Sequence, residues 1–247
     1  MEYNPYSLTG KTILVTGASS GIGKATAILC AQMGATVIVS GRNRERLYDV
    51  FKSLPIGMHE YYVSDLLSLN GIDELVSNLP VLDGLVFCAG IVKTMPVRNI
   101  QDTAIEEIFQ TNIISSIQLC KRLLRNKKIA KGGSVVFISS VSTFNVKIGN
   151  SLYSATKGAV NSFARAMALE VAPLKIRVNC IQPGFIQTGL LDSGIISQEQ
   201  LDTYMAKHPL GLGTPSDISN GCIYLLSDAS RWMTGSIITI DGGLTLQ

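Results

Sequence analysis

The sequence is poor in charged and aromatic residues, which make up 16% and 6% of its 247 positions. Its formal net charge of +3 comes from scattered Lys and Arg, and the short basic cluster at 121–131 is more typical of a solvated helix end than of a nucleic-acid surface. No apolar run approaches the roughly 18 residues of a membrane span, and the N-terminal residues lack a basic stretch followed by an apolar one. We therefore expect a soluble, cytoplasmic protein with no nucleic-acid or membrane partner.

Metal ligands and paired cysteines are also scarce. The two histidines, His59 and His208, are isolated, and neither a C-x-x-C nor an H-E-x-x-H pattern occurs, so no metal site is expected. The five cysteines are odd in number, widely spaced and mostly set among aliphatic residues. This usage is typical of reduced core cysteines in a cytosolic protein.

Repeats, low-complexity segments and linkers rich in Pro, Gly or Ser are absent as well, which predicts a single domain over residues 1–247. Short aliphatic runs recur between longer helical patterns, at 12–17, 35–41, 61–65, 84–90, 134–140, 176–184 and 236–243. Runs that are apolar throughout, rather than alternating, indicate strands buried on both faces. The predicted fold is α/β, a doubly wound parallel seven-stranded sheet (Rossmann fold) with helices between its strands.

The first of these runs leads into a turn that contains glycine, in the sequence TGASSGIGKAT. Ligands of open α/β sheets bind beyond the carboxyl ends of the strands. Glycines there let the backbone approach a pyrophosphate, and the helix predicted to begin near Gly21 offers free amides and a positive dipole end to an anion. Such turns also occur without any ligand, but the position after the first strand favours a dinucleotide.

Two motifs together resemble a known family. The turn has the spacing T-G-x-x-x-G-x-G, and Y-S-A-T-K occupies positions 153–157. This combination resembles the short-chain dehydrogenase/reductase family, and the resemblance runs the whole length of the chain. The C-terminal segments HPLGLGTPSDI and TGSIITIDGG are most similar to its branch of 3-oxoacyl-acyl-carrier-protein reductases and sugar or polyol dehydrogenases. Further matches, in the family's order, are Asp65, CAG at 88–90, TN at 111–112, ISS at 138–140, PG at 183–184 and DGG at 241–243.

Tyr153 and Lys157 are predicted to act as an acid–base pair. Residues i and i+4 of a helix share a face, so the two side chains would lie one above the other. A free phenol has a pKa of about 10, and we expect the neighbouring ammonium to lower it. The resemblance implies that Tyr153 exchanges a proton with the substrate oxygen and that Lys157 also holds the nicotinamide ribose. The alternative is a surface Tyr and a solvated Lys at helical spacing.

Ser140 and Asn112 complete the predicted catalytic set. By the family's spacing, Ser140 hydrogen-bonds the carbonyl oxygen; Ser139 is the alternative, and Ser142 a candidate second contact. Asn112 falls within the apolar stripe of its predicted helix, where a buried amide needs partners. It is a core residue that bonds nearby backbone or, as the resemblance implies, it distorts its helix and binds a water that relays protons from Lys157. The two roles are compatible.

The resemblance also assigns the contacts to the cofactor. Asp65 would bind the adenine amino group, Ala89 and Gly90 would line the adenosine ribose, and residues 183–188 would wrap the nicotinamide. Cys88 stands where the family usually has Asn, and we expect it to pack as a small hydrophobe rather than to act as a reactive thiol. The predicted cofactor-binding residues are Thr16, Gly17, Ser19, Ser20, Gly21, Ile22, Gly23, Ser40, Arg42, Asn43, Asp65, Leu66, Cys88, Ala89, Gly90, Tyr153, Lys157, Pro183, Gly184, Ile186 and Thr188.

The residues after the second predicted strand bear on the choice of cofactor. NAD enzymes of this architecture place Asp or Glu there to bind the ribose 2′-hydroxyl, whereas an Arg can receive a 2′-phosphate. Positions 39–44 read VSGRNR, and no carboxylate occurs before Glu45. Arg42 offers a planar donor fork, with Ser40 and Asn43 as polar supports. The sequence therefore predicts a preference for NADP(H) over NAD(H); the alternative is that Arg42 is a solvated residue at a helix start.

The expected function is NADP-dependent interconversion of a ketone and a secondary alcohol. A 3-oxoacyl thioester is the first candidate substrate, and a sugar, polyol or other small ketone is the second. A cofactor-binding sensor or scaffold without turnover is the alternative of another class, against which the complete catalytic set argues. The family commonly pairs the helix at 153–172 across one twofold axis and the last strand across another, which predicts a homotetramer. Residues 189–213 are expected to pack on the core, with or without closing as a lid.

Overall fold

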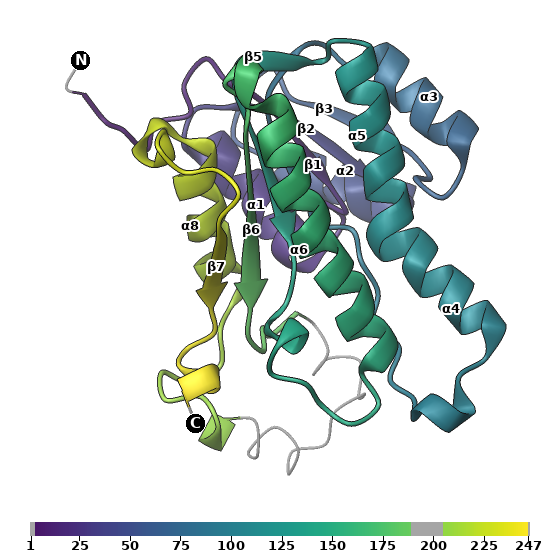
Figure 1. The fold of residues 1–247 in the computed structure, drawn as a ribbon. Helices are drawn as coiled ribbons and strands as arrows, with labels where there is room; N and C mark the ends of the chain where they lie inside the picture. Colours follow the sequence, from purple (N-terminus) through teal and green to yellow (C-terminus); the bar gives the residue numbers. More distant parts are fainter. Residues whose placement is uncertain (1–2, 189–204, 247) are drawn as a thin grey trace.

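The computed structural model describes residues 3–188 and 205–246 (Figure 1). In this part of the chain, seven strands form one parallel sheet in the order β3-β2-β1-β4-β5-β6-β7. The predicted doubly wound sheet is therefore confirmed. The strands are β1 (Thr12–Thr16), β2 (Thr36–Gly41), β3 (Glu60–Val63), β4 (Leu82–Phe87), β5 (Ile129–Ile138), β6 (Arg177–Pro183) and β7 (Ile237–Ile240).

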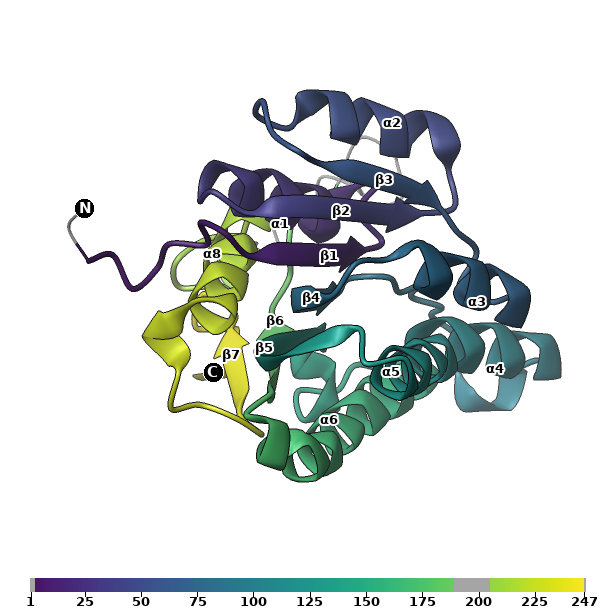
Figure 2. The same ribbon diagram turned by 90° about the horizontal axis from the view of Figure 1, so that it is seen from above.

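Helices cover both faces of the sheet, as the view from above shows (Figure 2). One face carries α1 (Gly21–Gln32), α2 (Arg44–Ser53) and α8 (Pro215–Leu226). The other carries α3 (Leu69–Asn78), α4 (Asp102–Phe109), α5 (Ser115–Arg125) and α6 (Ser151–Val171). Short turns of helix complete the described elements: η1 (Val97–Asn99), η2 (Gln110–Ile114), η3 (Val141–Thr143), η4 (Ala172–Leu174), η5 (Asp228–Ser230) and η6 (Leu244–Leu246).

The apolar runs of the sequence follow from burial of the strands on both faces. In β1, Ile13 and Val15 belong to the core beneath α1, α2 and α8, whereas Leu14 belongs to the core beneath α3, α5 and α6. All three side chains are fully buried. A strand packed between two layers of helices has no solvent face, so its sequence does not alternate between apolar and polar residues.

One strand is longer than its sequence predicts. β5 begins at Ile129, whereas the apolar run begins at position 134. Its pairing with β4 shifts register, since Leu82 pairs with Ile129 but Gly84 pairs with Ser134. The irregular stretch reads AKGG, and Gly132 has a φ of 83°. A bulge made of polar and glycine residues carries no apolar pattern, which explains why the sequence did not indicate it.

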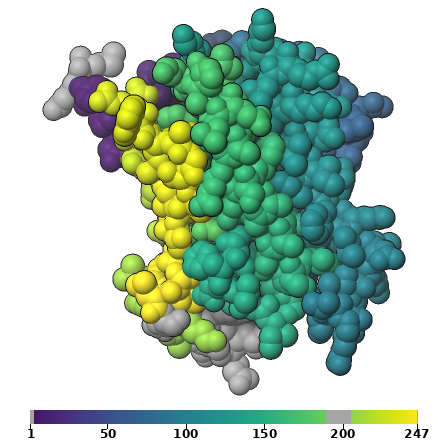
Figure 3. Space-filling model, viewed as in Figure 1, coloured from purple at the N-terminus to yellow at the C-terminus, as the bar shows by residue number. Residues whose placement is uncertain are grey.

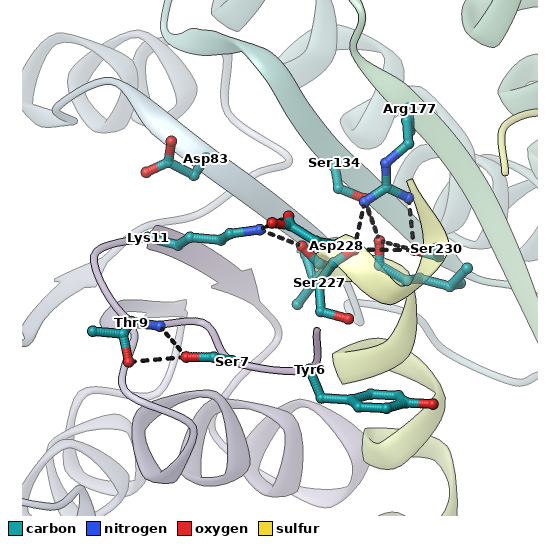
Figure 4. Close-up of polar contacts among 12 residues, drawn as sticks. Tyr6, Ser7, Thr9, Lys11, Asp83, Ser134, Arg177, Ser227, Asp228 and Ser230 are labelled. Atoms are coloured by element: carbon teal, nitrogen blue, oxygen red, sulfur yellow. Dashed lines mark hydrogen bonds and ion pairs between the residues drawn. The ribbon is translucent and has the colours of Figure 1, made fainter. Parts of the chain in front are cut away.

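Polar contacts fasten the amino-terminal ends of the strands (Figure 4). Lys11, just before β1, forms an ion pair with Asp228 at an Nζ–Oδ1 distance of 2.7 Å. Arg177, the first residue of β6, donates to Ser230 Oγ at 2.8 Å and to the Leu225 carbonyl at 2.7 Å. Burial lowers the pKa of its guanidinium. These contacts tie α8 and η5 to the sheet. The cleft lies at the opposite, carboxyl ends of the strands.

All five cysteines are unpaired, and four of them are buried. No described helix is both long and apolar enough to cross a membrane. Within residues 3–188 and 205–246, no group of three or more His, Cys, Asp or Glu side chains is arranged to hold a metal ion.

Candidate active site

A cleft of about 1360 Å³ lies at the carboxyl ends of β1 to β6. Every residue that the sequence assigned to the cofactor or to catalysis lines this cleft, except Thr16 and Asn112. Strands that are far apart in the sequence therefore bring these residues to one edge of the sheet, as the parallel arrangement predicts.

Thr16 is the one predicted cofactor contact that does not line the cleft. Its side chain is fully buried, and its Oγ1 donates a hydrogen bond to the Val86 carbonyl at 3.4 Å. As the last residue of β1, Thr16 points its side chain toward the neighbouring strand β4 and not into the cleft. The cleft wall begins one residue later, at Gly17.

The turn after β1 is built around close backbone contacts. Gly17 has a φ of 65°, and a Cβ at this position would lie 2.6 Å from the Ala89 nitrogen. A Cβ at Gly23 would lie 2.3 Å from the Gly17 carbonyl oxygen. Helix α1 begins at Gly21, as predicted, and the N-cap residue Ser20 makes no side-chain capping bond. The first amides of α1 are thus available to an anion, and the site fits the pyrophosphate of a dinucleotide.

Cationic side chains gather at the end of β2. Arg42 and Arg46 both line the cleft there, and Arg44 is not part of its wall. Asn43 lines the cleft but caps α2, because its side chain accepts a hydrogen bond from the Arg46 nitrogen at 2.9 Å. Ser40 is 1% exposed, and its Oγ has no hydrogen-bond partner among the described residues. A buried hydroxyl without a partner and two guanidiniums in the wall of one cleft fit a ligand with anionic and hydrogen-bonding groups.

Cys88 packs as a small hydrophobe. It lies against the core formed by the sheet with α1 and α8, and it also lines the cleft. Burial raises the pKa of its thiol well above the ordinary value. A neutral thiol is a poor nucleophile, so this residue replaces the family's Asn by packing and not by reactivity.

Tyr153 and Lys157 lie in the first turns of α6, at the mouth of the cleft. Lys157 Nζ is 5.7 Å from the centroid of the Tyr153 ring, so the i and i+4 side chains share a face as predicted. Lys157 is 5% exposed, and its Nζ donates to the Ile138 carbonyl at 2.7 Å. Burial lowers the pKa of this lysine to about 8. The side chain is therefore held in one position and titrates near neutral pH.

The prediction that Lys157 lowers the pKa of Tyr153 is wrong for the protein alone. The pKa of Tyr153 is raised because burial disfavours the phenolate, and a hydrogen bond with Ser140 opposes this rise. The ammonium of Lys157 is turned toward the backbone of β5, so it does not offset the burial.

The geometry favours Ser140 over Ser139 as the hydroxyl that faces substrate. Ser139 is 2% exposed, and its Oγ donates to the Lys157 carbonyl at 3.3 Å. Ser140 is the N-cap of η3, and its bond with Tyr153 places its Oγ beside the phenol. Ser139 therefore holds α6 against β5, while Ser140 remains available at the cleft.

Asn112 lies in a π-helical turn, η2, between α4 and α5. Its Oδ1 accepts from the Ile91 nitrogen at 2.8 Å, and its Nδ2 donates to the Ile91 carbonyl and to Thr156 Oγ1, both at 3.0 Å. The expected helix distortion and backbone bonds are both present. Asn112 Oδ1 and Lys157 Nζ each lie 3.4 Å from the position that a Cβ would take at Gly90. The two side chains thus both approach Gly90, Lys157 from the cleft wall and Asn112 from behind it.

Several cleft residues were not predicted from the sequence. Arg46 has a detectable signal, since it lies in the first turn of α2, directly after the loop that carries Arg42. The loop from Asn145 to Asn150 also has a detectable signal in the sequence, because a segment that joins Ser140 to Tyr153 must pass the site. Other lining residues without such a signal include Ser64, Ile91, Val92, Thr94, Thr111 and Leu244.

Most of the segment at 189–213, which was predicted to pack on the core with or without closing as a lid, lies outside the described residues. Leu190, Leu191, Ile195, Ile196 and Tyr204 all belong to that part, so the expectation for them stays a prediction. Two described residues of the segment, Met205 and Leu210, have exposed side chains.

Comparison with known proteins identifies the family. A sequence profile described as "Enoyl-(Acyl carrier protein) reductase" matches residues 17–245. The 3-oxoacyl-[acyl-carrier-protein] reductase FabG of Rickettsia felis is 32% identical over 243 residues, which span 97% of this chain and 98% of that protein. The chain belongs to the short-chain dehydrogenase/reductase family. The corresponding FabG of Thermotoga maritima is 33% identical over 247 residues, which span 97% of this chain and 99% of that one.

A solved short-chain dehydrogenase/reductase has the same fold. The protein from Mycobacterium ulcerans superposes with a TM-score of 0.88 at 31% identity, over 98% of this chain and 92% of that one. Membership of the family makes this short-chain dehydrogenase/reductase an NAD(P)-dependent oxidoreductase that acts on CH–OH groups.

Proposed function

We propose that this protein is a cytoplasmic, NADP(H)-dependent reductase of 3-oxoacyl thioesters. The observation that supports this best is a single cleft with Arg42 and Arg46 at one end and Ser140, Tyr153 and Lys157 at the other. The similarity to 3-oxoacyl-[acyl-carrier-protein] reductases over nearly the whole chain points to the same substrate class. Free cysteines are typical of a reducing compartment.

The proposed mechanism divides the reaction between hydride and proton. The nicotinamide, when bound, supplies the hydride that reaches the carbonyl carbon. Tyr153 donates its hydroxyl proton to the carbonyl oxygen, which completes the secondary alcohol. Ser140 donates a hydrogen bond to the same oxygen and stabilises the negative charge that develops on it. In the reverse direction, the Tyr153 phenolate takes the proton from the alcohol.

Lys157, in the cleft wall, and Asn112, behind it, support this chemistry. Lys157 would hold the nicotinamide ribose, and its ammonium would favour the Tyr153 phenolate once proton transfer begins. The bonds of Asn112 to Ile91 and Thr156 connect the strand end at β4 to the first turn of α6. We propose that the space at Gly90 between Asn112 Oδ1 and Lys157 Nζ holds the water that relays protons to solvent.

The substrate end of the cleft favours an acyl chain. Ile91, Val92, Ile148 and Phe185 give the wall of the cleft apolar surface. Burial of such surface stabilises a hydrocarbon chain but not a polyol. The second candidate, a sugar or polyol, is favoured by a polar pair in the same wall, in which Thr94 donates to Asn150 Oδ1 at 3.2 Å.

A substrate panel tests the proposal. Purified protein is mixed with NADPH and a series of 3-oxoacyl thioesters, sugar ketones and small ketones, and the loss of nicotinamide absorbance is followed. We expect the highest kcat/KM for a 3-oxoacyl thioester. A higher value for a sugar or polyol would select the second candidate. Cofactor binding without turnover on any member would instead support the sensor or scaffold class.

Arg42→Ala should weaken NADPH binding more than NADH binding. A charged, bidentate contact to a 2′-phosphate contributes roughly 1.5–3 kcal/mol, so the dissociation constant for NADPH should rise by about tenfold or more. Titration of both cofactors by fluorescence gives the two constants. Arg44→Ala is the matched control, because Arg44 is exposed and does not line the cleft. A higher efficiency with NADH than with NADPH in the unmodified protein would refute the proposed preference.

We also propose that the protein is a homotetramer. α6 and the C-terminal segment lie side by side on one face of the molecule (Figure 3), with Ala168 Cβ 3.7 Å from the position of a Cβ at Gly235. α6 presents small residues and an exposed Leu169 on that surface. β7 ends the sheet and leaves one edge for a second copy. Light scattering at micromolar concentration should give four times the chain mass of 26.5 kDa; a monomeric mass would exclude the proposal.

A further inference from the structure

Two serine hydroxyls meet at the entrance of the short helical turn after β5. Ser140 Oγ accepts one hydrogen bond from the Ser142 nitrogen at 3.1 Å and a second from Ser142 Oγ at 2.9 Å. Ser142 is 6% exposed and lines the cleft beside Ser140. Both hydroxyls are therefore partly withdrawn from solvent, and each is held close to the other.

When the Ser142 hydroxyl is the donor in the second contact, the two bonds use the full acceptor capacity of Ser140. A serine hydroxyl has two lone pairs and a single proton. With both lone pairs occupied by Ser142, the remaining bond of Ser140 is one that it donates. The direction of its bond with Tyr153, or with a substrate oxygen, is then determined by Ser142.

We propose that Ser142 is a positioning residue that makes Ser140 a hydrogen-bond donor toward Tyr153 and the substrate oxygen. The inference rests on the catalytic roles proposed above for Ser140 and Tyr153. It differs from a second contact with substrate, because Ser142 acts through Ser140. The lowering of the Tyr153 pKa by its bond with Ser140 has the direction that donation from the serine produces.

The turn that carries both serines is held by neighbouring bonds. Thr143 Oγ1 donates to the Ser140 carbonyl at 3.1 Å, and Gln182 of β6 donates to Thr143 Oγ1. Gln182 is 4% exposed. These bonds do not involve the Ser142 hydroxyl, so we expect the turn to persist when that hydroxyl is removed.

Loss of the Ser142 hydroxyl would leave one lone pair of Ser140 free. Ser140 could then accept a hydrogen bond from the Tyr153 hydroxyl, which would direct its proton away from the substrate oxygen. The tyrosine would be held in its neutral form, and proton transfer would start from a less productive arrangement.

The first test compares turnover in matched variants. Ser142→Ala should lower kcat by about fivefold to tenfold, the effect of one uncharged hydrogen bond, with KM and cofactor affinity little changed. Ser142→Thr keeps the hydroxyl and should restore kcat. Ser154→Ala is the control, since Ser154 Oγ is buried next to Tyr153 without a partner in the described part of the chain. A kcat for Ser142→Ala equal to that of the unmodified protein overturns the proposal.

The second test does not need turnover. Ultraviolet difference titration against Tyr153→Phe isolates the ionisation of Tyr153 from that of the other tyrosines. Its midpoint should move to higher pH in Ser142→Ala and return in Ser142→Thr. An unchanged midpoint overturns the inference even if kcat falls. A shifted midpoint in a protein that reduces no ketone would reject the proposed function and leave the role of Ser142 intact.

Discussion

Tyr153→Phe should lower turnover by roughly a hundredfold or more, the scale of general acid–base catalysis, while NADPH binding persists. The substitution keeps the ring and its packing in the first turn of α6, but it removes the hydroxyl that would transfer the proton. Ser140 cannot replace it, since its proton is needed to hold the substrate oxygen and an aliphatic hydroxyl is a far weaker acid than a phenol. Steady-state reduction of the best ketone and a cofactor titration measure the two effects.

A second tyrosine provides the control for this experiment. Tyr48 packs against Phe51 and Tyr61 on the outside of the sheet, and its side chain is exposed. Tyr48→Phe removes a hydroxyl in the same way and should leave kcat unchanged. If Tyr153→Phe retained near-normal kcat, the assignment of Tyr153 as the acid would be wrong.

Lys157→Met should abolish measurable turnover and also weaken cofactor binding. The side chain is buried and its Nζ lies beside Gly90 and the carbonyl of Ile138, where it would bind the nicotinamide ribose. Methionine fills a similar volume but donates no hydrogen bond. The expected loss of both turnover and cofactor binding distinguishes this variant from Tyr153→Phe, in which cofactor binding should persist. An unchanged dissociation constant for NADPH would contradict the ribose contact.

Lys157→Met should also change how the stability of the protein depends on pH. The pKa of Lys157 is about 8 in the folded protein and about 10.4 in an unfolded chain. Between these two pKa values the unfolded state binds more protons than the folded state. The contribution of Lys157 to the free energy of unfolding therefore increases as pH rises. Below pH 8 the cost of burying the ammonium is fully present. The stability of Lys157→Met relative to the unmodified protein should therefore be greatest near neutral pH and decline toward pH 10.

Urea unfolding at several pH values measures this difference. The exposed Lys121 of α5 supplies the control, because Lys121→Met removes a lysine that is not buried. Its relative stability should stay nearly constant over the same window. A constant difference for Lys157→Met as well would show that burial does not disfavour the charged form of this lysine.

The order of the elements was predictable because it depends on local pattern. Uninterrupted apolar runs indicated strands buried on both faces, and each lies within or close to an observed strand. A parallel sheet places the carboxyl ends of its strands together, so the sequence was sufficient to assign Gly21, Arg42 and Ser140 to one edge. The first residues of β5 were not predictable, since the bulge that contains Gly132 has no apolar pattern.

The helix around Asn112 shows a second limit of pattern analysis. Leu119 and Leu123 of α5 are fully buried, whereas Ile105 of α4 is 38% exposed. The π-helical turn η2 inserts an extra residue and rotates the helix that follows it. A stripe extrapolated through such a turn with one regular period therefore loses its phase.

The sequence alone determined the fold class, the position of the turn for a dinucleotide and the spacing of Tyr153 and Lys157, because these depend on residues close together in the chain. Only the tertiary structure decided how each group is used. It showed that burial raises the pKa of Tyr153 and lowers that of Lys157, and that Arg46 joins Arg42. It also placed Ser142 Oγ at 2.9 Å from Ser140 Oγ. Desolvation and hydrogen-bond direction depend on neighbours from several strands and helices, which no single segment of sequence contains.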